Sequence, residues 1–567
     1  MGIPSYFSYI IKNHSNIIRN KRQLKTKFSC LYMDCNSIIY DCVRKIECDT
    51  EPRPKEFNME DSIITQVIAK IETYIDSIQP SNVLYIAFDG VAPFAKMEQQ
   101  RTRRYKTGYL HLCNTDKPIN PSITDTDSSL SRFNTSAITP GTPFMNMLSL
   151  RVKRAFVGSG RHFGAATVIV SGSDEPGEGE HKMFQHIRDN KLTNDTIAIY
   201  GLDADLIMLS VFHCFSCENI YIFRESPEFG KAILGDSFAR DELLYLDNRA
   251  LSRAVLNEMG VSPNTKESIG RIYDYIFACF LLGNDFLPHF PALNIRTHGN
   301  YTVLETYRKL FAGNPERRFI SLESGNIQWK WVKLFLQELA KDEPAMILNE
   351  YESRAKLEKR FYPTNTKEEC GVAFDNIPTI YRAEEHYINP KENGWEKRYY
   401  RTAFHIETSD INNGFIDELC NNYMEGLEWT FKYYTEGCPH WRWKYNYHYP
   451  PLFSDLVQRI PNFETVFIDD TRGINSPFHP NTQLAYVIPP WNHPQLIPES
   501  IQKYLDENEY SKYYVGVSEL KFQWIFCRYF WESHAILPDI LLDKLEELDT
   551  FCRNKPNSKS KNTHAKK

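Results

Sequence analysis

Two pairs of carboxylates, each placed after an apolar β-branched run, constrain this 567-residue chain more than any other feature. The pairs are Glu178 with Glu180, after residues 166–170, and Asp203 with Asp205, after residues 196–200. Such runs predict buried strands of a parallel sheet. Ligands of open α/β sheets bind beyond the carboxyl ends of the strands, so both pairs are expected at one binding edge.

The spacing within each pair suggests convergence on one point. Alternate residues of an extended segment point the same way, so Asp203 and Asp205 are expected to converge. Glu178 and Glu180 would diverge in a regular helix, but Pro176 and the glycines beside them predict a turn. Four carboxylates directed at one spot repel each other unless cations neutralise them, and hard oxygen ligands suit Mg²⁺ or Mn²⁺. The sequence therefore predicts a metal site rather than solvated loop ends.

The same pattern recurs elsewhere in the chain. An apolar run over residues 28–33 ends at Asp34, and another over residues 83–88 ends at Asp89. A predicted helix over residues 269–282 leads into the loop that carries Asp285. The candidate metal ligands are thus Asp34, Asp89, Glu178, Glu180, Asp203, Asp205 and Asp285.

A local basic surface follows the second of these strands. Residues 91–106 predict a helix on which Lys96, Gln100, Arg103 and Arg104 share one face. The net charge of the whole chain is −6, so any surface for nucleic acid must be local. A solvated charged face is the alternative. The position directly after a strand-end aspartate favours a phosphate-binding face.

Changes in composition along the chain predict its organisation. Residues 1–310 form the expected α/β catalytic domain, in which the Ser/Thr/Asp-rich stretch 107–131 is expected to be a mobile insertion. Residues 311–550 form a second region rich in helical spacing and aromatic residues, and the basic residues 551–567 are expected to be disordered.

Two stretches of the second region stand out. Residues 437–456 interleave aromatic side chains with Arg442, Lys444 and His448, which suits stacking of nucleobases or an aromatic core seam. The two interpretations are compatible. The run over residues 477–494 is too rich in proline for regular structure to be expected.

Cysteine usage predicts an intracellular protein. The chain has 13 cysteines, no recognisable signal peptide and no apolar run of transmembrane length. His213, Cys214 and Cys217 resemble part of a zinc site, but no second pair at ligand spacing accompanies them. Buried structural thiols are the favoured interpretation.

The residues also carry a resemblance to the Xrn family of 5′→3′ exoribonucleases. The matching stretches are MGIPSYF, the Asp34 strand, FDGVAPFAKMEQQRTRRY, FNTSAITPGTPFM, PGEGEHK, GLDADLIML, LLGNDFLPH, GCPHWRWKYNYHYPP and PFHPNTQLAYVIPP. They occur in the family's order, from the first residue to beyond residue 490.

The resemblance implies a fold, an activity and a set of site residues. The fold is a mostly parallel α/β nuclease core of the PIN and flap-endonuclease kind, flanked by a largely helical second conserved region. The seven acids would bind two divalent cations, and Lys96, Gln100, Arg103 and Arg104 would hold the 5′-monophosphate of single-stranded RNA. The activity is processive hydrolysis to nucleoside 5′-monophosphates.

The chain departs from the family pattern in three respects. Tyr40 stands where the family has a histidine that stacks on the terminal base, and either Trp441 or Trp443 is its expected partner. A cysteine-and-histidine zinc knuckle is not visible, and the chain stops soon after the second conserved region. A cytoplasmic rather than nuclear location is the expectation, and the sequence does not specify protein partners.

Two other functions are compatible with the same core. A flap-type structure-specific endonuclease would need an opening through which a strand threads, whereas the basic helix suggests a closed phosphate pocket. An inactive RNA-binding scaffold would be expected to have lost metal ligands, and all seven acids are present. The preference for RNA over DNA depends on contacts to the 2′-hydroxyl that the sequence does not reveal.

Overall fold

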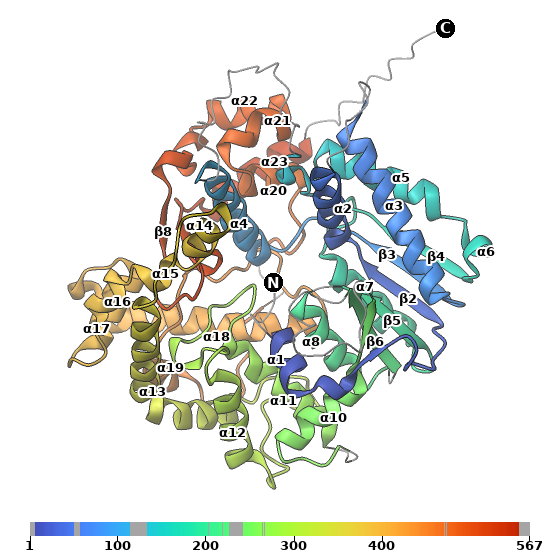
Figure 1. Ribbon diagram of the computed structural model, residues 1–567. Coiled ribbons are helices and arrows are strands. Elements are labelled where there is room, and N and C mark those ends of the chain that lie inside the picture. The colour runs from blue at the N-terminus through green and yellow to red at the C-terminus, as the bar shows by residue number, and fades with distance from the viewer. Residues whose placement is uncertain are drawn as a thin grey trace.

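A seven-stranded sheet forms the centre of the N-terminal part of this computed structural model (Figure 1). The structure describes residues 6–49, 57–113, 133–225 and 242–554, except 202, 218, 264, 266, 470 and 472. The strands are β1 (Ile18–Asn20), β2 (Cys30–Asp34), β3 (Val83–Ala87), β4 (Thr167–Ser171), β5 (Thr196–Tyr200), β6 (Asn219–Glu225) and β7 (Leu243–Asp247).

The order of the strands is β1-β7-β6-β5-β2-β3-β4. Neighbours from β6 to β4 pair in parallel, whereas β7 runs antiparallel to both β6 and β1. This confirms the predicted α/β class with a mostly parallel sheet. The edge strand β1 and its neighbour β7 lie outside the pattern of apolar runs, which predicted β2, β3, β4 and β5.

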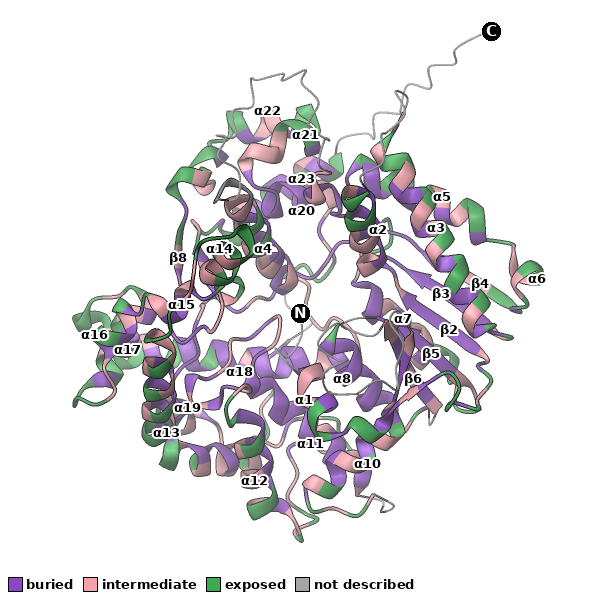
Figure 2. Cartoon of the chain, viewed as in Figure 1, coloured by how far each residue is buried: buried purple, intermediate pink, exposed green. Residues whose placement is uncertain are grey.

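Helices cover both faces of the sheet, as its buried β-branched strands require. Leu31 and Met33 of β2 pack with α2, α3 and α5, whereas Tyr32 points to the opposite face, towards α7 and α8. The strands are accordingly buried along most of their length (Figure 2). The helices of this part are α1 (Tyr6–Asn13), α2 (Asn36–Cys48), α3 (Met59–Ile78), α4 (Phe94–Cys113), α5 (Pro143–Phe156), α6 (Gly160–Phe163), α7 (Gly179–Asn190), α8 (Ala204–His213), α10 (Asn248–Glu258), α11 (Ser268–Cys279) and α12 (Gly299–Phe311).

The second region is helical, as the apolar spacing predicted. Its helices are α13 (Trp329–Glu358), α14 (Lys367–Asp375), α15 (Ile377–Ile380), α16 (Ala383–Ile388), α17 (Trp395–Phe404), α18 (Asn413–Thr435) and α19 (Phe453–Arg459). Figure 2 shows α18 buried over most of its length. Its C-terminal half packs against α8 beside the seven-stranded sheet, so the two regions share one core.

The last part of the chain returns to the sheet and corrects one prediction. The proline-rich residues 477–494 contain a regular helix, α20 (Pro480–Val487), which packs against α4. The prolines do not break this helix because Pro480 occupies its first turn, where the missing N–H is unpaired in any case. The remaining elements are α21 (His493–Leu496), α22 (Glu499–Glu507), α23 (Leu542–Asn554) and the antiparallel pair β8 (Lys521–Gln523) and β9 (His534–Ile536).

Two predicted irregular segments are partly helical. α4 continues through residues 107–113, so the start of the predicted insertion is helical, and residues 114–131 lie outside the described residues. α23 includes residues 551–554 of the predicted tail, and residues 555–567 also lie outside. Among the described residues, no helix has the length and apolar content needed to cross a membrane.

Candidate active site

The topology of the sheet brings acids from distant parts of the sequence together. β2 lies between β3 and β5, and the chain proceeds outwards from these strands in opposite directions. The loops that leave β2 and β5 therefore diverge and form the crevice in which α/β sheets bind ligands. Asp34 ends β2, and Asp203 follows β5.

The two carboxylate pairs share one local geometry, which differs from the predicted one. Glu178 and Asp203 are the extended N-cap residues of α7 and α8, and Glu180 and Asp205 lie in the first turns of these helices. The unpaired N–H groups and the dipole of a helix N-terminus stabilise such carboxylates. Asp203 and Asp205 do not lie on one extended segment as expected, because the helix begins between them at Ala204. Asp203 is exposed, whereas Asp205 is buried.

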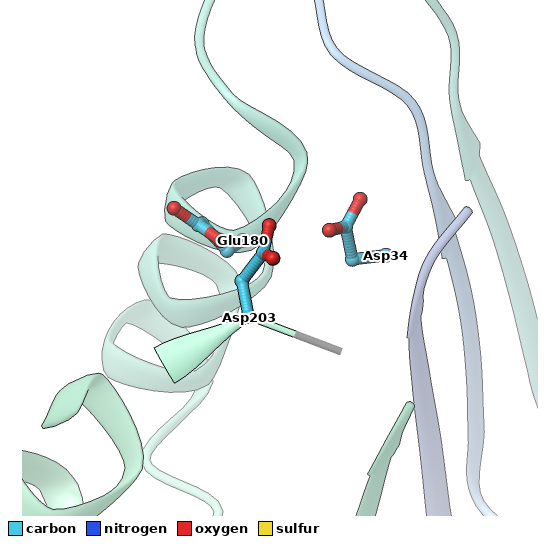
Figure 3. Close-up of side chains that lie close together, drawn as sticks. All are labelled: Asp34, Glu180 and Asp203. Carbon is cyan, nitrogen blue, oxygen red and sulfur yellow. The ribbon is translucent and has the colours of Figure 1, made fainter. Parts of the chain in front are cut away.

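Three carboxylates from different elements meet at the switch point. One carboxylate oxygen each from Asp34, Glu180 and Asp203 lie within 4.8 Å of one another, and Figure 3 shows the three side chains facing a common space. A Cβ at position 179 would lie 2.9 Å from Asp34 Oδ1, so Gly179 permits this approach. Asp89 adjoins the group and accepts a hydrogen bond from the Gly179 amide at 2.8 Å. A set of carboxylate oxygens alone fits a hard divalent cation.

The other acids surround Lys96 on α4. Its ammonium group forms ion pairs with Glu178 and, at 2.7 Å, with Asp285. Lys96, predicted to bind phosphate, is therefore engaged with two of the candidate metal ligands in this structure. Both ion pairs of Lys96 are buried, since the Glu178 and Asp285 side chains are almost fully covered.

The electrostatics of the site reflect an excess of buried negative charge. Burial, together with Asp89 and Asp203, raises the pKa of Asp34 well above its usual value. Burial and the charge of Glu178 do the same to the pKa of Glu180, and burial and Asp285 raise the pKa of Asp205 to about 6. Divalent cations would offset the mutual repulsion that one lysine leaves uncompensated.

Two of the predicted phosphate-binding residues on α4 are held by protein partners. Arg104 is buried and donates to the carbonyl oxygens of Thr135 and Ile138, at 3.0 and 2.6 Å. Gln100 is buried beside Gln483, whose amide donates to it at 3.3 Å. Arg103 is exposed. Of the four residues on this face, Arg103 is thus the one placed to meet a ligand without giving up a buried contact.

The two tryptophans proposed to stack on a base differ in accessibility. The Trp443 ring is stacked on Trp429 with ring centroids 5.2 Å apart and is only 9% exposed, so Trp441 is the more accessible of the two. Trp441 is half-buried at the start of α4, where its carbonyl accepts the Phe94 N–H at 3.0 Å. Burial acts to raise the pKa of Tyr40, but the charges of Arg104 and Arg103 outweigh it and lower the pKa below its usual value. Tyr40 therefore lies near the arginines of α4.

Two family profiles match the chain. That of the XRN 5′-3′ exonuclease N-terminus matches residues 1–226, and that of the Xrn1 helical domain matches residues 267–379 and 378–565. The chain belongs to the XRN family of 5′-3′ exoribonucleases. The metal, phosphate and stacking roles of individual residues remain predictions.

Similar proteins named 5′-3′ exoribonucleases match this chain over different shares of their own length. The 5′-3′ exoribonuclease 2 of Gallus gallus is 26% identical over 95% of this chain and 68% of its own length. The 5′-3′ exoribonuclease 1 of Homo sapiens is 28% identical over 100% of this chain, which spans only 35% of the human protein. A solved structure, the catalytic core of Rad2 in complex with DNA substrate, covers 77% of this chain and 87% of its own at 12% identity and a TM-score of 0.31. That score is too low to support an argument.

Two tyrosines that no sequence motif indicated bind the acid cluster of the exoribonuclease. From the end of α18, Tyr433 donates to Glu178 at 2.8 Å and Tyr434 donates to Asp205 at 2.6 Å. The His181 ring lies against Tyr433 at 3.6 Å between ring centroids. No local pattern signals this role, because aromatic residues in an apolar helix are ordinarily core residues. Only the packing of α18 on α8 reveals it.

Two stretches that the sequence left open contain buried side chains. Trp443, Tyr445 and Tyr449 of the aromatic stretch are all buried, so this part of the stretch contributes to the core. The His213 Nδ1–H donates to the Leu209 carbonyl at 2.8 Å, and burial lowers the pKa of His213 to about 3. Cys214 is buried, and its Sγ lies 3.1 Å from Ser252 Oγ.

The raised pKa values predict how the metal-free exoribonuclease responds to pH. The pKa of Asp205 rises from 3.8 to about 6, and those of Asp34 and Glu180 are also raised. Between the unfolded and the folded pKa values, the folded chain keeps protons that the unfolded chain has released. The free energy of unfolding should therefore fall as the pH rises through this range and stay low at higher pH. Melting temperatures in EDTA from pH 4.5 to 8 measure this. Asp205→Asn should give a flatter profile, and parallel profiles would contradict the assignment.

The tyrosine contacts predict a change in metal affinity. Tyr434→Phe removes the donor that orients Asp205, and loss of such a supporting hydrogen bond typically costs about 10–100-fold in metal affinity. We expect the Mg²⁺ concentration for half-maximal RNA hydrolysis to rise roughly tenfold, with little change at saturating Mg²⁺. Tyr399→Phe removes a buried hydroxyl bonded to the Pro450 carbonyl instead and is the control. Equal Mg²⁺ requirements of the two variants would count against the role of Tyr434.

Proposed function

We propose that the chain hydrolyses single-stranded RNA from a 5′-monophosphate end and releases nucleoside 5′-monophosphates processively. Two divalent cations, Mg²⁺ or Mn²⁺, would be held by the seven acids. The observation that carries the proposal is the convergence of Asp34, Glu180 and Asp203 at the switch point of the sheet, with Glu178 and Asp285 beside them. Membership of the exoribonuclease family supports it.

The cations would supply one part of the chemistry and the protein the rest. When bound, they would lower the pKa of an attacking water and stabilise the leaving 3′-oxygen. Tyr433 and Tyr434 hold Glu178 and Asp205 in fixed orientations from the helical region. The exposed guanidinium of Arg103 would bind the terminal phosphate and set the position of the first phosphodiester.

Lys96 links metal binding to phosphate binding in this proposal. Its ion pairs with Glu178 and Asp285 compete with any role at the phosphate. Cations bound to those carboxylates would take over their neutralisation and leave the ammonium for the substrate. The proposal therefore requires that divalent cations and the 5′-monophosphate bind cooperatively.

A single set of reactions tests the proposal against its alternatives. Linear and circular forms of one RNA, the linear form with a 5′-monophosphate, are incubated with Mg²⁺ or with EDTA. We expect mononucleotides from the linear RNA with Mg²⁺, an intact circle and no reaction in EDTA. Cleavage of the circle would favour an endonuclease. Binding without hydrolysis of either RNA would favour a scaffold.

Tyr40 is proposed to stack on the first base, with Trp441 as its partner. Stacking of a base on an aromatic ring is worth about 1–3 kcal/mol by alanine substitution. Tyr40→Ala should then slow RNA degradation more than tenfold, whereas Tyr40→Phe keeps the ring and should have a mild effect. Single-turnover decay of 5′-monophosphate RNA compares the two. Equal rates in Phe and Ala variants would remove stacking as the role of Tyr40.

A further inference from the structure

A cavity lies directly beside the acid cluster. It has a volume of about 350 Å³ and lies between α4 and three segments from the C-terminal half, residues 282–296, 445–449 and 525–534. This volume is within the range of roughly 300–1,000 Å³ typical of small-molecule sites. Asp285, which pairs with Lys96 in the acid cluster, and Arg103 both line it. The cavity therefore shares a border with the active site.

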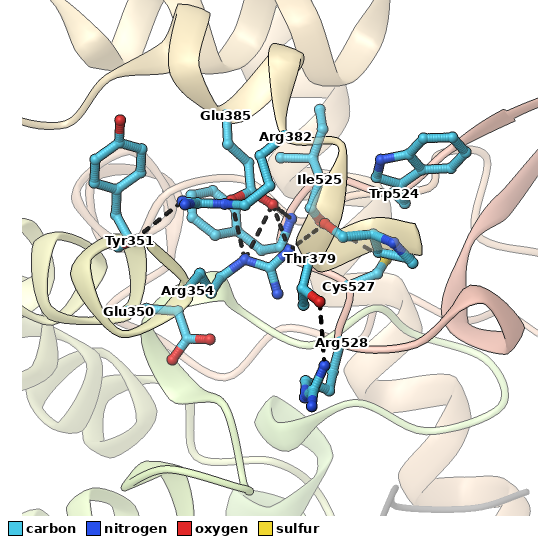
Figure 4. Close-up of polar contacts among 12 residues, drawn as sticks. Glu350, Tyr351, Arg354, Thr379, Arg382, Glu385, Trp524, Ile525, Cys527 and Arg528 are labelled. Carbon is cyan, nitrogen blue, oxygen red and sulfur yellow. Dashed lines mark hydrogen bonds and ion pairs between the residues drawn. The ribbon is translucent and has the colours of Figure 1, made fainter. Parts of the chain in front are cut away.

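One wall of the cavity is held in a strained conformation. Phe526 has a φ of 57°, in the left-handed region that bulky side chains rarely adopt. Its amide donates to Glu385 at 2.9 Å, and Glu385 is itself buried between Arg354 and Arg382 (Figure 4). Backbone strain persists where the surroundings fix it and is concentrated at functional sites and ligand clamps. The ion-pair network thus presets the shape of this wall.

A second contact fastens the same wall to α4. The Lys106 ammonium donates to the carbonyl oxygens of Trp531 and Ser533, at 2.7 and 2.8 Å. Arg296 pairs with Glu532 at 2.6 Å and lies over the Trp531 ring. Residues 531–533 are therefore anchored from two sides, and the cavity has fixed borders rather than a loose seam.

The lining combines aromatic surface with neutral hydrogen-bonding groups. The rings of His448 and His534 are stacked with centroids 4.9 Å apart and an interplanar angle of 16°. Burial lowers the pKa of both, so each imidazole is neutral and offers one donor and one acceptor. Apolar surface predominates in the lining, which includes Phe530 and Trp531. Such a surface suits a planar heterocycle with polar edges.

We propose that this cavity binds a nucleoside 5′-monophosphate. The base would lie against the aromatic lining, with its edges or the ribose hydroxyls hydrogen-bonded to His448 and His534. The phosphate would meet Arg103 at the border with the acid cluster. The inference rests on the proposed function, because the proposed reaction releases this compound beside Asp285. The same chemistry would also admit a free nucleotide from solution.

Photolabelling of the full-length chain with 8-azidoadenosine 5′-monophosphate locates the bound base. We expect saturable labelling of peptides within residues 445–449 or 525–534, reduced at least tenfold by excess AMP. Labelling confined to Tyr40 or Trp441, or no saturable labelling, would overturn the proposal. RNA decay is measured on the same preparation. Decay without cavity labelling removes this inference alone, and cavity labelling without decay removes the proposed function alone.

Two variants test the location of the site. Thr102 lines the cavity on α4, and Thr102→Trp fills it, whereas Thr73→Trp places the same ring on the exposed face of α3. We expect labelling to fall at least tenfold in the first variant and to stay unchanged in the second; equal labelling would contradict the site.

An RNA whose 5′-terminal nucleotide carries the azide shows whether the bound nucleotide comes from the reaction or from solution. Labelling that survives excess AMP during digestion indicates direct transfer of product, and suppression indicates filling of the site from solution.

Discussion

Asp203→Asn is expected to reduce RNA hydrolysis by a factor on the order of 10³ or more while the RNA still binds. The substitution keeps the shape of the side chain but removes one of the three carboxylates that meet within 4.8 Å at the switch point. Loss of a single preorganised electrostatic contact in an active site typically costs about 10²–10³-fold, and loss of a cation should cost at least as much. Single-turnover decay and filter binding of the same 5′-monophosphate RNA measure the two effects.

The same substitution should stabilise the metal-free protein. Asp203 is one of the charges that raise the pKa of Asp34, so its removal relieves repulsion in the folded state. We expect a higher melting temperature than wild type in EDTA and a smaller increase on addition of Mg²⁺. Asp174→Asn is the matched control, since Asp174 is an exposed carboxylate after β4 that pairs with Lys153. Near-wild-type turnover of the Asp203 variant at saturating Mg²⁺ would show that the site is assigned wrongly.

Local pattern was sufficient to predict the sheet core and the position of its acids. Strands β2, β3, β4 and β5 coincide with apolar runs because the helices on both faces exclude water from them. Asp34 and Asp89 could be placed at a common edge because parallel strands end at the same side. The three-residue edge strand β1 and its neighbour β7 carry no apolar β-branched run of this kind. Their pairing is set by tertiary contacts.

Side-chain direction could not be predicted, because it depends on where each helix begins. An extended segment would have aligned Asp203 with Asp205, but α8 starts between them, and Asp203 is exposed whereas Asp205 is buried. Helical periodicity placed Arg103 and Arg104 on one face, yet neighbouring positions on a helix differ by about 100°. That difference directs Arg104 towards the carbonyl oxygens of Thr135 and Ile138 and leaves Arg103 exposed.

Partners that are distant in sequence account for the remaining differences. Trp443 lies in a stretch whose composition suits base stacking, but α18 supplies Trp429 to cover it. Tyr433 and Tyr434 contact acids more than two hundred residues away in the chain, at Glu178 and Asp205. Neither relation has a periodic signature. They follow from the docking of the helical region on the nuclease sheet.

The strongest expected dependence on substrate is on the chemistry of the 5′ end. A monophosphate can form charge-assisted hydrogen bonds with Arg103, and each such bond contributes about 1.5–3 kcal/mol. This corresponds to a rate advantage of roughly tenfold to over a hundredfold over a 5′-hydroxyl, which leaves the guanidinium without its anion. A triphosphate or a cap adds bulk beside α4 and should leave the RNA nearly inert. Decay rates of four single-stranded RNAs that differ only at the 5′ end measure the preference.

Two arginine variants connect this preference to the structure. Arg103→Gln should bring the monophosphate and hydroxyl rates within about threefold of each other and leave the melting temperature unchanged, because Arg103 is exposed. Arg104→Gln should instead lower the melting temperature, since it leaves the Thr135 and Ile138 carbonyls without their donor, and unpaired buried groups cost about 1–3 kcal/mol each. If wild-type protein degrades all four RNAs equally, α4 holds no phosphate pocket. The acid cluster would then act without selecting an end, as in an endonuclease.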